Sequence, residues 1–156
     1  MEIKPEELIY KLQNAATLPQ ANLLVVHGEE DYYRQKIVTA LPEALFQGVD
    51  SADRAITSFD KDTDLNELAS IINTYPFFSG QSLVVLKDEK LLAAKAESEA
   101  RKQQLDKLAD ILSDIPDYCT VLVSASKLDK RTKLFKALKK SALMCECASI
   151  KLNNLS

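Results

Sequence analysis

The segment with the clearest bearing on chemistry is a turn rich in carboxylates, His27-Gly28-Glu29-Glu30-Asp31, which follows a short apolar run. In an α/β protein, the turn after the first strand is the usual place for a phosphate-binding loop. Such a loop needs several glycines, whose backbone N–H groups approach the anion, and then Lys followed by Ser or Thr. This turn offers one glycine and three consecutive acids, which would repel a triphosphate. We therefore expect no nucleotide cofactor bound in the usual manner.

Two further groups are similar to catalytic residues. Asp88 and Glu89 follow an apolar run, as the magnesium-binding acids of nucleotide hydrolases do. Without a glycine-lysine loop they have no phosphate to serve, and Asp88 suits a helix N-cap with Glu89 in the first turn. His27, the single histidine, could act as a general base, but the sequence marks no nucleophile or orienting acid beside it. A structural role is the better interpretation of His27, and we predict no catalytic residue.

The three cysteines are Cys119, Cys145 and Cys147, and they lack the Cys-x-x-Cys and histidine spacing of a zinc site. Residues two apart share one face of a strand, which places Cys145 and Cys147 together. Because buried free cysteine behaves as a small apolar residue, we predict core packing and no metal.

Basic residues concentrate near the C-terminus, where one acid, Asp129, stands among seven cations: Lys127, Lys130, Arg131, Lys133, Lys136, Lys139 and Lys140. Such a run could follow a phosphate backbone. A solvated helix face, with lysines near the C-terminus where the helix dipole favours cations, is the simpler interpretation.

The segment Asn73–Gln81 is the most suggestive part of the chain. Pro76 ends the preceding helix, and Gly80 allows the reversal into the next strand. The loop between them contains three aromatic residues: Tyr75, Phe77 and Phe78. In one interpretation, one or two rings, such as that of Phe78, fasten the loop to the core. In the other, Phe77 with Pro76 fills an apolar pocket of a partner protein, where burying one ring is worth roughly 1.5–3 kcal/mol.

The composition indicates one globular domain. The 156 residues are 46% hydrophobic, and the net charge of −3 provides no overall field that would attract a polyanion. No apolar run approaches the roughly 20 residues of a membrane span, and the N-terminus lacks a secretory signal pattern. We expect a cytoplasmic protein with no membrane partner.

Short apolar runs alternate with helical periodicity, a pattern typical of a parallel sheet covered by helices. The predicted strands are Leu23–His27, Ala55–Phe59, Ser82–Leu86, Thr120–Ser124 and Leu143–Cys147. Five helices are predicted. The first begins near Pro5, the second spans Asp31–Leu41, the third follows a cap at Asp64, the fourth includes Leu105–Leu112, and the fifth spans Asp129–Lys140. The segment Ala93–Gln104 is either an exposed extension of the fourth helix or a mobile loop. The fold class is therefore α/β, a three-layer domain of about five strands over residues 1–150, and Lys151–Ser156 is interpreted as the start of a linker.

Several local sequences together resemble one family, the delta subunit of the bacterial DNA polymerase III clamp loader. The resemblance rests on Leu24–Asp31, on Tyr75–Ser79 with the strand Gln81–Leu86, and on Thr120–Val123 with Lys127–Arg131 and Leu134–Leu138. Each motif is weak alone, but their order and spacing are fairly specific. The resemblance implies the N-terminal domain, with an AAA+ type fold that is P-loop NTPase-like but lacks a working P-loop.

The resemblance also implies a function and its partners. The domain would bind the beta sliding clamp and open its ring for loading onto primed DNA, without intrinsic catalytic activity, as one subunit of a DNA-directed DNA polymerase, a nucleotidyltransferase. Clamp-binding positions of the family correspond here to Pro76 and Phe77, with Phe78 adjacent, although relatives often have leucine where this chain has Pro76. The full-length protein would assemble through lid and collar domains with gamma/tau and delta-prime subunits, and DNA would be met indirectly through the complex.

Three alternatives remain. A delta-prime-like structural subunit would share the architecture, but its Ser-Arg-Cys motif and zinc-binding cysteines are missing here. A small nucleotide-binding α/β enzyme would need an atypical phosphate site. A DNA-binding module would use the basic segment Lys127–Lys140, and its affinity would fall steeply with salt.

Overall fold

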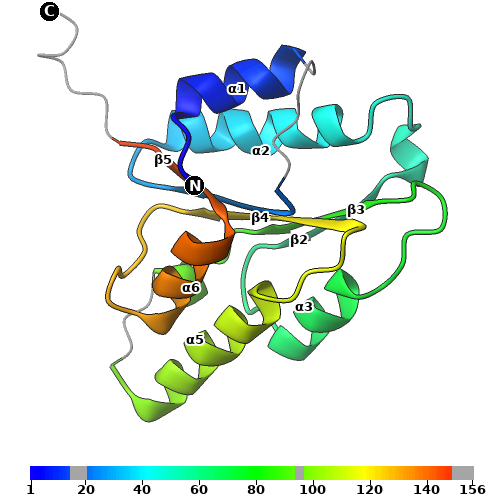
Figure 1. The fold of residues 1–156 in the computed structure, drawn as a ribbon. Helices are drawn as coiled ribbons and strands as arrows, with labels where there is room; N and C mark the ends of the chain where they lie inside the picture. Colours follow the sequence, from blue (N-terminus) through cyan, green and yellow to red (C-terminus); the bar gives the residue numbers. More distant parts are fainter. Residues whose placement is uncertain (15–20, 94–96, 149–156) are drawn as a thin grey trace, which may run out of the picture.

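A central parallel sheet organises the protein, as seen in the computed structural model, which describes residues 1–14, 21–93 and 97–148 (Figure 1). The strands are β1 (Leu23–His27), β2 (Ala55–Phe59), β3 (Ser82–Leu86), β4 (Cys119–Ala125) and β5 (Leu143–Glu146). Their order in the sheet is β2-β3-β4-β1-β5, and all the pairs are parallel. The predicted α/β fold class and five strands are confirmed, although β5 ends at Glu146, one residue before the predicted end.

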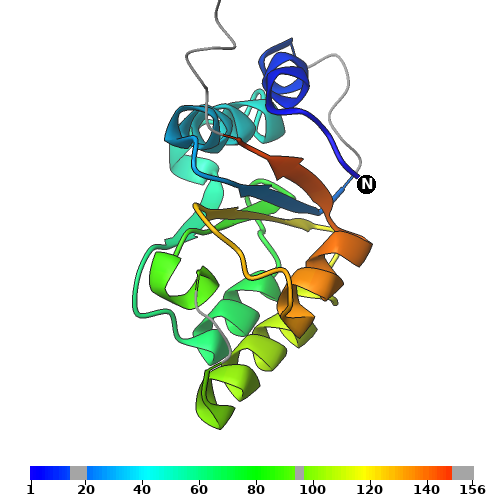
Figure 2. The ribbon, with the colours of Figure 1, turned by 90° about the vertical axis from the view of Figure 1, so that its left-hand side faces the viewer.

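Helices cover both faces of the sheet, which gives three layers (Figure 2). One face carries α1 (Pro5–Asn14) and α2 (Asp31–Leu45). The other carries α3 (Leu65–Ile72), α4 (Glu89–Leu92), α5 (Glu99–Leu112) and α6 (Lys133–Ser141). A short 3-10 turn, η1 (Ser51–Asp53), precedes β2. None of the helices in the described ranges is long and apolar enough to cross a membrane.

The interior strands are apolar on both faces because both faces are covered. In β1, Leu23 and Val25 belong to the core under α3, α5 and α6, whereas Leu24 and Val26 belong to the core under α1 and α2. Successive side chains of a strand point to opposite faces of the sheet, and here a layer of helices covers each face. The edge strand β2 differs, because Ile56 and Ser58 are exposed while Ala55 and Thr57 are partly buried.

Two helix boundaries differ from the predictions for local reasons. Helix α2 was predicted to end at Leu41 but continues past Pro42 to Leu45; the Pro42 carbonyl accepts from the N–H of the fully buried Phe46 at 3.0 Å. Helix α6 was predicted to begin at Asp129, but Asp129 accepts from the Arg131 N–H in a turn.

Thr132 then caps α6, its hydroxyl accepting from the Phe135 N–H at 3.1 Å. Helix α5 begins at Glu99 behind the cap Ser98, so residues 99–104 form the helical extension that was one of the two options for this segment. Residues 94–96 of that segment, and the predicted linker 151–156, lie outside the described residues.

Candidate functional site

The aromatic loop lies between the end of α3 and the start of β3, at the amino edge of the sheet. Asn73 ends α3, and its backbone N–H and side-chain amide both donate to the Ala69 carbonyl, at 3.1 and 2.8 Å. The loop then returns to β3, where Ser82 pairs with β2 and with β4. Both ends of the loop are therefore anchored in regular secondary structure.

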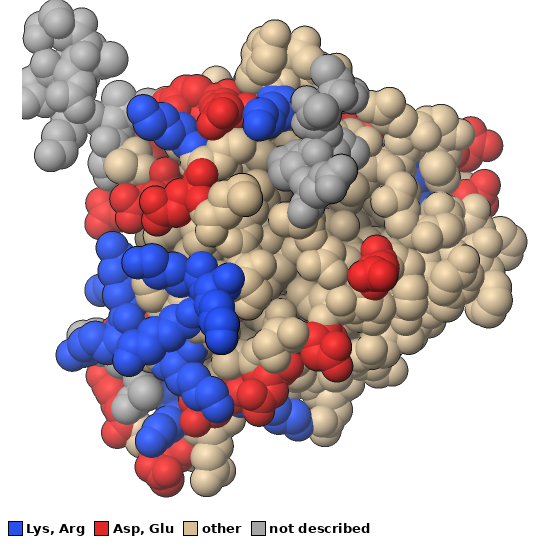
Figure 3. Space-filling model, in the orientation of Figure 1, with Lys and Arg blue, Asp and Glu red and all other residues tan. Residues whose placement is uncertain are grey.

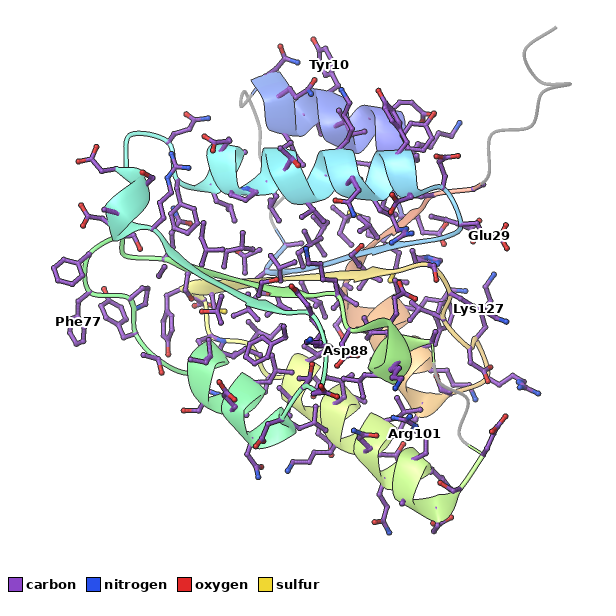
Figure 4. The ribbon with its side chains drawn as sticks, turned by 180° about the vertical axis from the view of Figure 1, so that it is seen from behind. Tyr10, Glu29, Phe77, Asp88, Arg101 and Lys127 are labelled. Carbon is purple, nitrogen blue, oxygen red and sulfur yellow. The ribbon has the colours of Figure 1, made fainter. Side chains whose placement is uncertain are left out.

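Two adjacent phenylalanines project from this loop into solvent. Phe77 is 86% exposed and Phe78 is 87% exposed, and Figure 4 shows Phe77 directed away from the body of the protein. Phe78 thus does not fasten the loop to the core, which was one of the two interpretations of the sequence. Pro76, which was predicted to fill a partner's pocket together with Phe77, is buried in the isolated domain.

A chain of aromatic contacts braces the first half of the loop. The ring of Tyr75 meets that of Phe77 edge-on at 5.4 Å between centroids, and that of Tyr118 at 5.2 Å. Tyr118 also donates its hydroxyl hydrogen to the Asn73 carbonyl at 2.8 Å. Such T-shaped pairs are favourable beyond their buried area. Tyr118 immediately precedes β4, and no local signal in the sequence connects it with a loop more than 40 residues earlier.

Hydrogen bonds brace the second half. The Gly80 N–H donates to the Pro76 carbonyl at 3.0 Å, and Gly80 has a φ of +72°, which the reversal requires and glycine tolerates. Ser79 donates to the Gln81 carbonyl at 2.6 Å. The side-chain amide of Gln81 donates to the Leu45 carbonyl at the end of α2, also at 2.6 Å. The phenylalanines are therefore carried on an ordered backbone.

The acidic first turn, at the opposite edge, directs its backbone inward. The Gly28 N–H donates to the Ala125 carbonyl at 3.0 Å and the Glu30 N–H to the Cys147 carbonyl at 3.1 Å. A phosphate-binding loop would present such N–H groups to an anion. Gly28 has a φ of +131°, and a Cβ there would stand 2.1 Å from the Cys147 carbonyl oxygen. The glycine therefore serves the close approach of two protein segments.

Nearby charged side chains are also engaged within the protein. Arg34 is 9% exposed, and its guanidinium lies 3.3 Å from Asp31 and 3.9 Å from Glu89. The Glu89 carboxylate accepts from both the backbone N–H and the hydroxyl of Ser126, each at 2.7 Å. These contacts join the first turn to the segments that follow β3 and β4.

The predicted capping role of Asp88 is confirmed. Asp88 is 3% exposed, and its carboxylate accepts from the Leu91 N–H at the start of α4. It also accepts from the backbone N–H and hydroxyl of Thr63, at 3.1 and 2.7 Å. Glu89 occupies the first turn of α4, as expected.

His27 and the cysteines pack inside the protein. His27 is 8% exposed and meets the Phe135 ring edge-on at 6.1 Å; desolvation by burial lowers its pKa. All three cysteines are buried thiols, and burial raises the pKa of Cys119. Across the described residues, no group of three or more His, Cys, Asp or Glu side chains is arranged to hold a metal ion.

Two solved structures share the fold of this chain. A solved structure of a Bacillus subtilis DNA clamp loader delta protein superimposes with a TM-score of 0.76 at 24% identity, covering 96% of this chain and 44% of that one. A DNA polymerase III gamma subunit-related protein from Thermotoga maritima superimposes with a TM-score of 0.59 at 14% identity, covering 96% and 47%. These likenesses establish the fold.

Sequence comparison establishes the family. The model of the DNA polymerase III delta subunit family matches residues 24–148, most of the chain. The DNA polymerase III subunit delta of Bacillus subtilis is 27% identical over 128 residues, which are 80% of this chain and 37% of that protein. This chain belongs to the DNA polymerase III delta subunit family, and it spans about two-fifths of the length of the relatives it matches.

Proposed function

We propose that this domain binds the sliding clamp of its replication machinery by inserting Phe77 into an apolar pocket of one clamp subunit. The observation that carries the proposal is the pair of adjacent phenylalanines, 86% and 87% exposed, on a loop whose backbone is held at both ends. Large apolar side chains exposed together commonly mark an interaction site. The membership of the delta subunit family supplies the partner.

The order of the loop adds to the proposal. A flexible loop would lose conformational entropy on binding, whereas a loop already held by Tyr118 and Gln81 loses less. Burial of one phenylalanine ring contributes roughly 1.5–3 kcal/mol, and a few such anchors dominate most interfaces. Phe77 and Phe78 are the two anchors in this proposal, and Pro76 contributes by fixing the turn from inside.

Clamp binding would favour an opened ring. If Phe77 binds its pocket more tightly when the neighbouring clamp interface is open, binding shifts the clamp toward the open state. The domain would then open the clamp without chemistry of its own. Nucleotide binding and hydrolysis would belong to other subunits of the loader, because the first turn here uses its N–H groups of Gly28 and Glu30 within the protein.

The test is isothermal titration calorimetry of the cognate clamp against the parent chain and three variants. We expect Phe77→Ala to weaken binding by about 2 kcal/mol or more, roughly 30-fold in Kd, and Phe78→Ala to weaken it by less. The matched control is Tyr10→Ala, which removes an aromatic ring that is 68% exposed on α1 and distant from the loop (Figure 4). Tyr10→Ala should leave the affinity unchanged.

Folding does not confound this comparison. Because Phe77 contributes little to the core, its replacement should change the free energy of unfolding by less than about 0.5 kcal/mol. Equal losses in Phe77→Ala and Tyr10→Ala would refute the loop as the anchor. Absence of binding by the parent chain would refute clamp binding by this domain.

A further inference from the structure

The two edges of the sheet are not equally open to another strand. At the β5 edge, the Met144 N–H donates to the Met1 carbonyl at 2.8 Å, and the Ile3 N–H donates to the Met144 carbonyl at 2.9 Å. The N-terminal residues thus lie along β5, where Glu2 forms a parallel bridge with Met144. Charged side chains also crowd the surface on this side of the molecule, at the left of Figure 3. The β5 edge is therefore covered.

The β2 edge, on the other side of the sheet, lacks this cover. β2 pairs with β3 and is the last strand of the sheet in that direction. Figure 4, which views the molecule from behind, shows β2 as the strand nearest the viewer, with no helix in front of it. Exposed edge strands are commonly protected by a lysine, a proline or a bulge. β2 contains no charged residue and no proline, and Ile56 is 41% exposed, so this edge can accept another strand.

The backbone of β2 presents hydrogen-bonding groups on the open side. The Lys87 N–H donates to the Phe59 carbonyl at 2.9 Å, so the backbone groups of Phe59 point toward β3. Because the backbone groups of successive residues in a strand point in opposite directions, those of Ile56 and Ser58 point away from β3. The Ile56 N–H makes a local bond to the Arg54 carbonyl at 3.1 Å. The carbonyls of Ile56 and Ser58 and the Ser58 N–H are therefore directed at the open edge.

The residues around Thr57 are complementary to a second copy of themselves. A two-fold axis at Thr57 places Ile56 of one copy opposite Ser58 of the other in an antiparallel pair, and these are the residues whose backbone groups point outward. Beyond the ends of the two strands, the same axis brings Asp53 beside Lys61. Both of these side chains are exposed, and neither has an ion-pair partner within 4.0 Å in the described ranges. The symmetry therefore creates two pairs of opposite charge.

We propose that two copies of this chain associate by antiparallel pairing of their β2 strands, which joins the two sheets into one. Ile56 is then covered by the neighbouring strand, and opposite charges flank the pairing at both ends. A closed two-fold interface of this kind uses the same residues from each copy. Two strands of five residues bury less than the roughly 1,200–2,000 Å² of a stable interface. The dimer should therefore be weak, with a Kd between about 10 µM and about 1 mM.

The aromatic loop is a second apolar surface that could hold two copies together, and it can be tested separately. Phe77 and Phe78 lie outside β2 and contribute nothing to the pairing of its backbone. Phe77→Ala should therefore leave the dimer unchanged while it weakens clamp binding. The inference goes beyond the proposed function and does not rest on it, so either proposal can fail while the other holds.

The test is sedimentation equilibrium of the whole chain at concentrations from about 5 µM to about 500 µM, a range chosen for the expected Kd. The average mass of the parent should rise from that of one copy toward that of two. Ser58→Pro removes an outward N–H group, and proline is tolerated on an edge strand where the N–H does not bond to the neighbouring strand. We expect Ser58→Pro to remain a single copy throughout. Ile56→Lys, which keeps every backbone group and adds a charge to the edge, should weaken association at least about fivefold.

Exchange of the flanking charges tests the two-fold arrangement. Asp53→Lys places lysines opposite each other at both ends of the pairing, and Lys61→Asp places aspartates there. Each single variant should weaken association at least about fivefold, because like charges across a strand pair repel. The double variant Asp53→Lys/Lys61→Asp restores opposite charges and should return to within about twofold of the parent. A response to net charge alone would instead have opposite signs in the two single variants.

Glu97→Lys and Lys102→Asp are the matched controls. They make the same changes of charge at exposed positions close to the start of α5, away from β2. Both should associate as the parent does. Urea unfolding followed by circular dichroism verifies that each variant, Ser58→Pro above all, is folded under the conditions of the assay.

Several results would overturn the proposal. The parent could remain a single copy at the highest concentration, or folded Ser58→Pro and Ile56→Lys could associate as well as the parent. A double charge variant no better than the single variants would rule out the two-fold axis at Thr57. Loss of association in Phe77→Ala would assign the contact to the aromatic loop. If the parent stayed single while a synthetic Thr-Val-Thr-Val-Thr peptide shifted the amide resonances of Ile56 and Ser58, the edge would take an extended peptide instead of a second copy.

Discussion

The loops at the two edges of the sheet differ in which groups they leave exposed to solvent and which they use for contacts within the protein. At the carboxyl edge, the turn after β1 contains a glycine and three acids, and its N–H groups of Gly28 and Glu30 are spent on the carbonyls of β4 and of Cys147. At the amino edge, the loop before β3 has its backbone held by Asn73, Gly80 and Gln81 while two phenylalanines stay exposed. The carboxyl edge is the usual ligand site of α/β folds.

The difference shows what makes a surface available for binding. Groups that could bind an anion at the first turn are committed to holding β1, β4 and the end of β5 together. In the aromatic loop, the apolar rings of Phe77 and Phe78 stay in solvent. The contacts with the rest of the protein are made by the loop backbone and by Tyr75. An exposed apolar side chain on a fixed backbone is available to a partner, whereas a satisfied N–H group is not.

A matched pair of glycine substitutions sharpens this comparison and has the largest expected effect on stability. Gly28→Ala would place a Cβ 2.1 Å from the Cys147 carbonyl oxygen at a φ of +131°. We expect a loss of about 2–4 kcal/mol in the free energy of unfolding, from backbone strain and from separation of the two segments. Urea denaturation followed by circular dichroism measures it.

Gly80→Ala is the control at the amino edge. Its φ of +72° also favours glycine, but a Cβ there meets no atom within 4 Å. The cost should be only the left-handed conformation, about 1–2 kcal/mol. If the two alanine variants lost equal stability, the close approach at Gly28 would not be what fixes the first turn.

A smaller effect is expected from the brace of the aromatic loop. Tyr118→Phe removes the hydroxyl that donates to the Asn73 carbonyl while leaving the ring against Tyr75. We expect clamp affinity to fall by about 0.5–1 kcal/mol, roughly two- to fivefold, because the loop must then be ordered on binding. Calorimetry with the clamp detects the change, and Tyr10→Phe is the control. An unchanged affinity would mean that the hydroxyl does not pre-order the loop.

The elements of the fold were predictable because burial on both faces leaves a strong pattern. The continuous apolar runs of β1, β3 and β4 marked interior strands, and the spacing of Leu65, Leu68 and Ile72 marked the buried face of α3. The boundaries that differed depended on single hydrogen bonds. Thr132 rather than Asp129 caps α6, a choice between two good capping residues that local sequence does not decide.

The aromatic loop was predictable as a loop but not in its detail. Pro76 and Gly80 marked its limits and Phe77 its exposed tip, since those signals are local. Pro76 is buried and Phe78 is exposed, and the loop that carries them is braced by the ring contact of Tyr75 with Tyr118. A contact between residues 43 apart in the chain leaves no mark in the sequence of either segment.

The smallest expected effect is the dependence of stability on the protonation of His27. This effect belongs to the carboxyl edge of the sheet, because the single histidine of the chain ends β1 there. Desolvation by burial lowers the pKa of His27; Glu146 and Glu2 act in the opposite direction, and Lys130 adds to the lowering. The unfolded chain, with a histidine pKa of about 6.5, therefore binds more protons than the folded chain just below that pH. The unfolded state is favoured as the pH falls, so His27 should make the protein less stable at pH 5.5 than at pH 7.5.

His27→Gln tests this sign because no other histidine titrates in the chain. Urea unfolding of parent and variant at pH 7.5 and 5.5 gives four free energies, and the difference between the two pH responses isolates the imidazole from the carboxylates. The variant should lose less stability than the parent on acidification. Equal pH responses of parent and variant would mean that the His27 imidazole is protonated as readily in the folded state as in the unfolded state. Burial against Phe135 would then have no effect on the pKa of His27.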